Sequence, residues 1–533
     1  MVQSPHPDVT IPDVSVYDYL FGGIAGEELD EIALIDGTSG GTSSYRELIG
    51  QVGLTAGALA ARGVGVGDVI ALLCPNVPAF ATVFHAILRA GATATTVNSL
   101  YTADEIASQL TDAGATWFFT VSPLLAGAKA AAERVGIGDD HLVVLDGAEG
   151  HPSLRALLSE GHPAPDVSFD PATHLAVLPY SSGTTGRPKG VMLTHANLVA
   201  NVEQSRATIG VEAGDRVLAV LPFFHIYGMT VLLNYALKCR ATLVTMPRFD
   251  LPEFLRVISE HRTTWVFIAP PIAVALAKHP LVDQYDLSSV KVVFSGAAPL
   301  DGALAERVAE RLDGIVSQGY GMTETSPVTH VIPLDRPDLD RSSIGFLLPN
   351  TEARVVDVES GADVDVPVEG PSRPGELWIR GPQVMQGYLG NAEATAAMLD
   401  DEGWLRTGDI ATVTADGVFR IVDRLKELIK YKGYQVAPAV LEAALLGHPL
   451  IADAAVIGVL DADGQEVPKA FVVAQPGAEL DADTVMAHVA GIVAPHERVR
   501  VVEFIDVIPK SSSGKILRKD LRAREQAPSF GPP

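Results

Sequence analysis

Residues 175–190 of the chain read LAVLPYSSGTTGRPKG. The opening run, LAVLPY, is short and apolar, which predicts a buried strand. The remainder is rich in glycine and hydroxyl residues and contains Arg187 and Lys189 but no acid. Glycines allow a tight turn that presents backbone N–H groups to an anion, and hydroxyls and cations add donors for phosphate oxygens. We interpret the stretch as a phosphate-binding loop; a flexible surface linker fits an acidic protein less well.

This loop is not a Walker A motif. That motif ends in Gly-Lys followed by Ser or Thr, whereas Lys189 here precedes Gly190 and Val191. The sequence therefore predicts a phosphate site of a different kind.

On both sides of the loop, amphipathic helical patterns alternate with short apolar runs. Capping boxes at 44–47 and 102–105 open two of the helices, and the runs at 69–74 and 290–295 are typical of buried strands. Continuous apolar strands between helices indicate parallel sheets that helices cover on both faces. So many units require more than one sheet.

The pattern changes near residue 340. Between 351 and 381 the segments are strand-rich and punctuated by Gly and Pro, which predicts a small β-subdomain. After Asp423 a short α+β unit follows, and we expect it to end in a basic helix at about 515–524. That basic segment lacks the interleaved aromatic residues of a nucleic-acid-binding patch.

The composition narrows the function classes. The chain has 533 residues, 65 acidic and 39 basic side chains, and a formal net charge of −26. Such a surface repels phosphate backbones and anionic lipids, which argues against a general nucleic-acid-binding protein. Two cysteines, Cys74 and Cys239, rule out a disulfide scaffold and a cysteine-only zinc site. The sequence opens without a basic and apolar leader, so we expect a cytoplasmic protein.

Residues 217–237 carry no formal charge and are long enough to span a bilayer. However, Pro222 and His225 interrupt the stretch, and proline removes a helical donor and clashes with the preceding turn. We therefore expect a buried strand at 217–221, a turn, and a buried helix from about Tyr227 in place of a membrane span.

Four further motifs follow the phosphate loop. They are QGYGMTE at 318–324, WLRTGD at 404–409, VDRLKELIK at 422–430 and PKSSSGK at 509–515. In this order, and over nearly the whole chain, the motifs resemble those of the adenylate-forming superfamily of acyl-CoA ligases, luciferases and peptide-synthetase adenylation domains. Within it, FHIYG, SGAAPL, QGYGMTE and KELIKYKGYQVAP are most similar to 4-coumarate–CoA ligases and their bacterial relatives.

The resemblance implies an α/β fold with a large N-terminal AMP-binding domain (1–423) and a small, mobile α+β C-terminal lid (424–533). The large domain would hold two parallel αβ sheet subdomains to about residue 340, then a β-barrel-like subdomain at about 341–423. The implied enzyme is an ATP-dependent acid–CoA ligase, which forms an acyl-AMP, releases pyrophosphate and transfers the acyl group to coenzyme A (CoA). Its expected partners are ATP, CoA and a small carboxylic acid, without nucleic acid or a membrane span, and its expected cofactor is Mg²⁺.

The resemblance also implies which residues bind the nucleotide. The expected ATP or AMP contacts are Ser181, Ser182, Gly183, Thr184, Thr185, Lys189, Gln318, Gly319, Thr323, Asp409 and Arg424. Glu324 would bind Mg²⁺ together with Thr184, a role that suits a carboxylate. Asp409 would accept the two ribose hydroxyls, with Arg424 as its partner.

Lys515 is implied as the catalytic cation that bridges the acyl carboxylate and the α-phosphate. From composition alone it would be a solvated lysine before a basic helix. His225 is implied to orient the carboxylate between the two half-reactions, and its alternative is a satisfied core histidine.

A further group of residues is implied for the second half-reaction. Lys430 and Gln435 match residues that act at the adenylate. Lys432 and Gly433 match the stretch that meets CoA. Arg248 aligns with a basic residue near the CoA phosphates, although it could equally be an ordinary surface arginine.

By the same resemblance, the acyl group would lie among Ile226, Tyr227, Thr230, Gly296, Ala297, Gly319, Gly321, Pro327 and Val328. Glycines leave a slot, and Tyr227 offers a flat face that a planar phenylpropenoid would fit, so we expect 4-coumarate or a related aryl acid. A medium- or long-chain fatty acid stays open, because one methylene changes binding by only about 1–3 kcal/mol. A luciferase-type oxidation and a nucleotide-binding regulator without catalysis are more distant alternatives.

Overall fold

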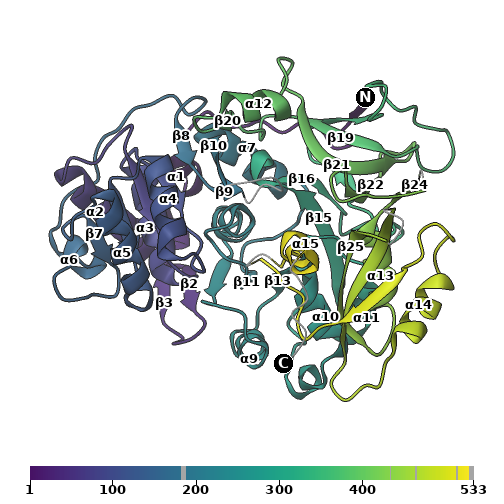
Figure 1. The fold of residues 1–533 in the computed structure, drawn as a ribbon. Coiled ribbons are helices and arrows are strands. Elements are labelled where there is room, and N and C mark those ends of the chain that lie inside the picture. Colours follow the sequence, from purple (N-terminus) through teal and green to yellow (C-terminus); the bar gives the residue numbers. More distant parts are fainter. Residues whose placement is uncertain (182–187, 433, 462–464, 512–513, 527–533) are drawn as a thin grey trace.

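A computed structural model describes residues 1–181, 188–432, 434–461, 465–511 and 514–526, and at 434, 435 and 526 the backbone alone. Two large mixed sheets, an antiparallel five-stranded sheet and a C-terminal α+β unit make up the fold (Figure 1). One large sheet with its helices lies at the left of Figure 1, and the C-terminal unit, in yellow-green and yellow, lies at the right. The predicted α/β fold class is confirmed.

The first large sheet has nine strands in the order β17-β16-β15-β14-β13-β11-β12-β2-β3. They are β2 (Ile32–Asp36), β3 (Thr42–Ser44), β11 (Arg216–Ala219), β12 (Thr242–Thr245), β13 (Trp265–Ile268), β14 (Val292–Ser295), β15 (Ile315–Gly321), β16 (Val328–Val331) and β17 (Phe346–Leu347). From β2 to β15 the neighbouring strands run parallel. Their carboxyl ends share one edge, so His225, Gly296 and Glu324, which follow three of these strands, are brought to the same side.

The second large sheet has eight strands, ordered β20-β10-β8-β5-β4-β6-β7 with β9 paired to β10. They are β4 (Val69–Leu72), β5 (Thr93–Thr96), β6 (Trp117–Thr120), β7 (Leu142–Val144), β8 (Leu175–Val177), β9 (Tyr180–Ser181), β10 (Lys189–Thr194) and β20 (Gly387–Tyr388). Along β4, Ile70 and Leu72 belong to the main core, while Ala71 and the following Leu73 pack in a second core. Both faces of this strand are therefore buried, as its continuous apolar run predicted.

Helices cover both sheets. They are α1 (Val16–Phe21), α2 (Tyr45–Ala61), α3 (Pro78–Arg89), α4 (Ala103–Ala113), α5 (Leu125–Val135), α6 (Leu154–Ser159), α7 (His195–Arg206), α8 (Tyr235–Lys238), α9 (Leu251–His261), α10 (Pro270–Lys278) and α11 (Gly302–Leu312). Both predicted capping boxes are confirmed: Ser44 and Glu47 cap α2, and Thr102 and Glu105 cap α4.

The uncharged stretch at 217–237 is a strand, a turn and a helix, as predicted. Its helix opens with a π-helix over Tyr227–Asn234 before α8, a widening that the sequence pattern did not predict. Gly228 permits this entry, because a Cβ there would lie 2.1 Å from the carbonyl oxygen of Pro222. Among the described residues, no helix is both long and apolar enough to cross a membrane.

The five-stranded sheet is antiparallel, in the order β1-β18-β19-β21-β22. Its strands are β1 (Val2–Gln3), β18 (Glu352–Val356), β19 (Gly375–Arg380), β21 (Leu405–Val413) and β22 (Phe419–Arg424), and α12 (Ala392–Met398) lies between β20 and β21 in the chain. Two strands within the range expected for the β-subdomain pair elsewhere: β17 joins the first large sheet, and β20 joins the second. The start of the chain takes an edge of the smaller sheet through β1.

Over its described residues, the C-terminal unit contains a three-stranded sheet, a hairpin and three helices. Its elements are β23 (Ile429–Tyr431), β24 (Tyr434–Val436), α13 (Pro438–Leu446), β25 (Ile451–Leu460), β26 (Glu466–Ala474), α14 (Ala482–Ala490), β27 (Val501–Phe504) and α15 (Arg518–Gln526). The last helix begins at Arg518, not at 515 as expected, because Lys510 and Ile516 form a β-bridge that keeps the chain between them out of a helix. Lys515 therefore lies in a loop.

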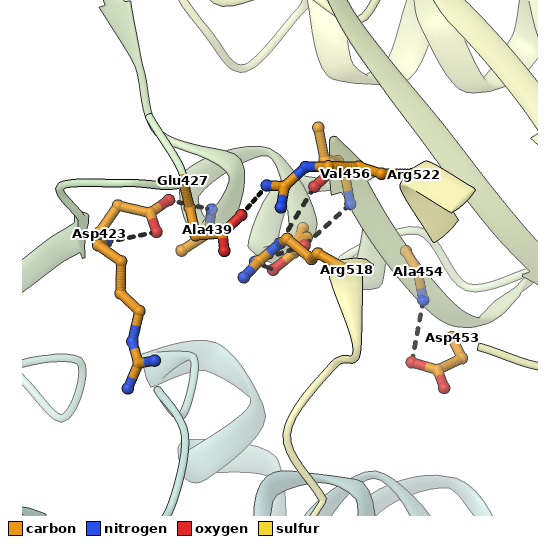
Figure 2. Close-up of polar contacts among 10 residues, drawn as sticks. Asp423, Glu427, Ala439, Asp453, Ala454, Val456, Arg518 and Arg522 are labelled. Atoms are coloured by element: carbon orange, nitrogen blue, oxygen red, sulfur yellow. Dashed lines mark hydrogen bonds and ion pairs between the residues drawn. The ribbon is translucent and has the colours of Figure 1, made fainter. Parts of the chain in front are cut away.

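A buried charged cluster fastens α15 to the rest of this unit (Figure 2). Arg518 donates from Nη2 to both carboxylate oxygens of Glu442, at 2.8 and 2.7 Å, and from Nε to the carbonyl oxygen of Val456. Glu442 also accepts from the backbone N–H of Val456 at 2.8 Å. One turn along α15, Arg522 forms an ion pair with Glu427. Burial raises the pKa of Glu442 and the Arg518 charge opposes that rise, so the two charges depend on each other.

Removing either partner of the Glu442–Arg518 pair should destabilise the C-terminal unit. A buried pair that loses one member leaves an uncompensated charge, at a cost of about 3–5 kcal/mol, whereas apolar replacement of both members can be close to neutral. We expect E442L and R518M each to lower the free energy of unfolding by that amount, and the E442L/R518M double variant to be more stable than either. Thermal unfolding and limited proteolysis measure this; single variants as stable as the wild type would contradict it.

Candidate active site

Four charged residues from distant parts of the sequence gather at the carboxyl edge of the first large sheet. We call Glu324, Asp409, Arg424 and Lys515 the charged site. The charges of the first three all act on the ammonium of Lys515. The sequence predicted these residues from separate motifs, with Arg424 as the partner of Asp409, and the structure brings all four together.

Glu324 lies in a single 3₁₀ turn, Thr323–Thr325, directly after β15, and its side chain is buried. Its Oε1 accepts hydrogen bonds from Ser181 Oγ at 3.1 Å and Tyr388 OH at 2.8 Å. Ser181 is the last described residue before 188, so the start of the predicted phosphate loop lies against this carboxylate. Lys189, at the start of β10, lies over the Tyr388 ring, 4.8 Å from its centroid.

Asp409 and Arg424 face each other across the pair β21–β22. The Arg424 Nε lies 3.3 Å from Asp409 Oδ1, and the Tyr320 hydroxyl donates to Asp409 Oδ2 at 2.5 Å. Asp409 is only 5% exposed, so these partners balance a charge that water reaches poorly. The pair presents an acceptor and a cation next to each other.

Two hydrogen bonds between Ser511 and Lys515 fix the backbone that places Lys515 in the charged site. The backbone N–H of Ser511 donates to the Lys515 carbonyl at 2.8 Å, and Ser511 Oγ accepts from the Lys515 N–H at 3.2 Å. Gly514 has φ +82°, and a Cβ on it would lie 3.1 Å from Ala269 Cβ. The loop therefore packs closely on the chain that precedes α10, and a side chain at 514 would be strained as well as crowded.

The pKa of Lys515 is lowered to about 8, first by burial and next by the neighbouring Arg424 charge, while the charges of Asp409 and Glu324 act in the opposite direction. Burial likewise lowers the pKa of His225 to about 3, with the Lys515 charge adding to the effect. His225 is therefore neutral at physiological pH, and its Nδ1 accepts from the Tyr227 N–H at 3.3 Å. The other ring nitrogen then carries the proton and can donate.

The residues expected around the acyl group form contacts in pairs. A Cβ on Gly296 would lie 2.7 Å from the Tyr227 ring, and one on Gly321 would lie 2.0 Å from the Pro327 carbonyl oxygen. Ala297 adopts φ +71°, an uncommon conformation for a residue with a Cβ. The site thus has an aromatic face and two positions, 296 and 321, where a side chain larger than that of glycine would clash.

The remaining residues predicted around the acyl group are buried or closely packed. Ile226 and Thr230 are fully buried, and Thr230 Oγ1 has no hydrogen-bond partner among the described residues. Gly319 approaches Phe294, whose ring would lie 3.0 Å from a Cβ at 319. Val328 is held by Asn201 of α7, whose side-chain amide bonds both its carbonyl at 2.7 Å and its N–H at 3.0 Å.

Other predicted residues are exposed or are bonded to the backbone. Lys430 and Lys432 are exposed on the β23–β24 hairpin, and Arg248 is exposed between β12 and α9. The Gln318 side chain bonds the backbone of Leu300 and Arg341, so its amide braces the edge of the sheet.

Several predicted residues cannot be placed. Ser182, Gly183, Thr184, Thr185 and Gly433 lie outside the described residues, and Gln435 is described by its backbone alone.

Sequence reasoning gave no role to two residues that support the site. Tyr320, the donor to Asp409, lies inside the QGYGMTE motif, so the motif itself carried that signal. Asn201 lies on α7 outside every motif, and its partner Val328 is 127 residues away in the chain. Only the folded structure reveals that contact.

Known proteins share this architecture. The family model described as AMP-binding enzyme matches residues 24–389, and that of the AMP-binding enzyme C-terminal domain matches residues 440–515. The 4-coumarate–CoA ligase 5 of Oryza sativa subsp. japonica is 41% identical over 528 residues, which cover 97% of this chain and 96% of that protein.

Solved structures agree. The ATP-bound MatB of Rhodopseudomonas palustris has a TM-score of 0.86 at 29% identity, covering 97% of this chain and 99% of that one. The apo form of the same protein gives a TM-score of only 0.77 at 29% identity, over 97% and 99% of the two chains. A benzoate CoA ligase of Burkholderia xenovorans LB400 gives 0.85 at 26% identity, over 96% of this chain and 100% of that one. Because the first family model spans more than half of the sequence, and the rice relative is similar along nearly its whole length, the chain belongs to the family of AMP-binding enzymes.

Proposed function

We propose that the protein is an ATP-dependent, AMP-forming acid–CoA ligase. The observation that carries the proposal is the charged site, in which Lys515 is held in a partly buried position beside Asp409, Arg424 and Glu324. The similarity to a 4-coumarate–CoA ligase over 97% of the chain supports the same reaction class.

In the first half-reaction, a carboxylate oxygen attacks the α-phosphorus of ATP and pyrophosphate leaves with the electron pair of the broken P–O bond. Two anions must approach each other, so the step needs aimed cations and donors. Lys515 would lie between the carboxylate and the α-phosphate, which Thr323 would also contact. Asp409 would accept the ribose hydroxyls, while Ser181 and Lys189 would contact the outer phosphates.

The remaining nucleotide contacts continue from the same motifs. Ser182, Gly183, Thr184 and Thr185 would complete the phosphate loop. Gln318 and Gly319 would border the adenine, the former through its backbone because its side-chain amide is already bonded to Leu300 and Arg341. Arg424 would support the ribose together with Asp409.

In the second half-reaction, the CoA thiolate attacks the acyl carbonyl carbon, and AMP leaves with the electron pair of the C–O bond. Lys430, Gln435, Lys432, Gly433 and Arg248 are our candidates at this step. Lys430 and Lys432 are exposed in the present arrangement. The unit from 424 to 533 would therefore act as a lid on the domain 1–423 and turn about Asp423–Arg424 between the two steps.

The residues around Glu324 are suited to bind the Mg²⁺ ion that the resemblance to the family implies. Glu324 Oε1 accepts hydrogen bonds from two hydroxyl groups, those of Ser181 and Tyr388. The described residues contain no cluster of three or more His, Cys, Asp or Glu side chains, and Mg²⁺ typically uses one or two carboxylates plus substrate phosphates and waters. Glu324, with Thr184, would hold the ion, whose charge would offset that of the phosphates when bound.

For the acyl group we propose 4-coumarate or a related planar aryl acid. His225 would orient its carboxylate, and the Tyr227 ring against Gly296 offers one flat wall. The other wall would be formed by Ile226, Thr230, Ala297, Gly321, Pro327 and Val328. We also propose a cytoplasmic location, since both cysteines are free, as suits a reducing compartment.

Replacing Lys515 with alanine should abolish one half-reaction and spare the other. Loss of a transition-state charge contact costs about 10²–10³ in rate. We therefore expect K515A to lose acid-dependent ATP–pyrophosphate exchange by at least this factor, yet to form thioester from synthetic acyl-AMP at the wild-type rate. K519A, which removes an exposed lysine four residues further on, serves as the matched control. Equal loss of both steps in K515A would disprove the two-orientation lid.

The pH dependence of adenylation should report the Lys515 pKa. Since this pKa is lowered to about 8 by burial, the ammonium loses its proton as pH rises through that value, and kcat/KM for adenylation should fall there. Arginine stays protonated up to about pH 12, so K515R should lose this alkaline limb even with a lower plateau. Pyrophosphate exchange across the alkaline range measures both; an unchanged limb in K515R would assign it to another group.

The acyl preference can be tested with 4-coumarate, cinnamate, benzoate and octanoate. If a flat slot selects the substrate, kcat/KM for 4-coumarate should exceed that for octanoate by at least about tenfold, since one methylene alone accounts for about 10–200-fold. The measurement is acid-dependent consumption of CoA. Faster turnover of octanoate would instead establish a fatty acyl-CoA ligase.

A further inference from the structure

Helix α13 of the C-terminal unit is held at both ends by charged side chains from outside that helix. At its start, Asp423 Oδ2 accepts from the backbone N–H of Ala439 at 2.9 Å, where the helix's own N-cap residue, Ala437, has no side-chain donor or acceptor (Figure 2). At its end, Lys278 Nζ donates to the carbonyl oxygens of Leu446 at 3.3 Å and Ile451 at 3.2 Å.

These two contacts match the charge that a helix presents. The N-terminus of a helix carries partial positive charge and favours an acid, and the C-terminus carries partial negative charge and favours a cation. Within Pro438–Leu446 the last turn contains no basic residue. Lys278 therefore supplies a cation that α13 lacks, and it does so from a helix 168 residues earlier in the chain.

Lys278 is the last residue of α10, and α10 is firmly fixed in the large domain. Ala273 and Leu276 of this helix are buried in the main core. Arg311 donates to the carbonyl oxygens of Leu276 and His279, both at 2.9 Å, so the end of α10 is tied to α11. The Lys278 side chain thus extends from a rigid base.

The opposite end of α10 contacts the loop that carries Lys515. Gly514 packs on Ala269 and Pro271, at the start of the helix. One helix of nine residues therefore meets the C-terminal unit twice, at the catalytic loop and at the end of α13. Both contacts are present in the orientation that places Lys515 in the charged site.

We propose that Lys278 is a positioning residue that stabilises the lid orientation used for adenylate formation. It acts through α13 and touches neither substrate nor nucleotide. This proposal rests on the proposed two-step function and deepens it. When the lid turns to bring Lys430 and Lys432 inward, contacts of 3.2–3.3 Å to the backbone of α13 and β25 must break.

Two observations favour a contact that forms and breaks. Arg307 and His448 both lie close enough to interact with the Lys278 charge, and neither is an acid that would hold it permanently. In addition, this chain resembles ATP-bound MatB more than apo MatB, at TM-scores of 0.86 and 0.77, so one member of the family adopts more than one overall arrangement.

The test compares the two half-reactions in K278M, which keeps the aliphatic stem and removes the ammonium. We expect acid-dependent ATP–pyrophosphate exchange to fall about three- to tenfold, the range of a partly exposed helix-end charge. Thioester formation from synthetic acyl-AMP should be unchanged or faster. K278R keeps a cation and should restore exchange. K129M, on α5 with an ion pair to Asp139, removes one positive charge far from the lid and should have no effect.

A second measurement needs no substrate. Amide hydrogen exchange of residues 509–517 and of the end of α13 should be faster in K278M than in the wild type or K129M, because the docked orientation becomes less populated.

The outcomes separate the proposals. Equal losses in both half-reactions, or a drop in melting temperature that K278R does not rescue, would make Lys278 a general stability residue. No change in either half-reaction or in amide exchange would overturn the proposal and leave the ligase function standing. If the wild-type enzyme shows no ATP–pyrophosphate exchange with any acid, the ligase function is overturned. Amide hydrogen exchange would still decide whether Lys278 positions the C-terminal unit.

Discussion

Asp423 and Arg424, the last two residues of β22, connect the charged site with the hydrogen bond that holds the start of α13. Successive side chains of a strand point to opposite faces. Arg424 therefore faces Asp409, while Asp423 faces the N-terminus of α13. Burial raises the pKa of Asp423, and the backbone N–H of Ala439 and the Arg518 charge act against that rise. A single peptide unit thus joins the nucleotide side of the site to the helix that orients the C-terminal unit.

The strongly acidic composition and the chemistry of the site are compatible because cations are placed locally. A net charge of −26 repels polyanions from most of the surface. At the carboxyl edge of the first large sheet, however, Arg424 and Lys515 lie together and are balanced by Asp409 and Glu324. Burial makes the charges of Asp409 and Glu324 count for more than exposed ones, since low dielectric strengthens their interactions.

Much of the fold could be predicted because its signals are local. The strands β4 and β14 and the capped helices α2 and α4 follow from apolar runs and capping boxes only a few residues long. The π-helix over Tyr227–Asn234 was missed, since an apolar stretch has the same composition in either helix type. The start of α15 was placed too early because a long-range β-bridge, not local propensity, keeps Lys515 out of the helix.

In the candidate site, too, residues with local sequence signals could be predicted and residues with long-range contacts could not. Motifs identified Glu324, Asp409 and Lys515, because each lies in a short stretch with unusual composition. Asn201 and Lys278 could not be found, since both act on backbone atoms, which any residue could supply, more than 100 residues away.

The pairing of β1 with β18 has a consequence for how the chain is made. Ser4 donates to the carbonyl oxygen of Leu347 across 343 positions, and Val9 and Asn350 are bonded nearby. At ribosomal speeds of about 5–20 residues per second, the first of these segments would wait roughly 20–70 s for its partner to emerge. During synthesis, β1 therefore stays without its partner strand until β18 has been made.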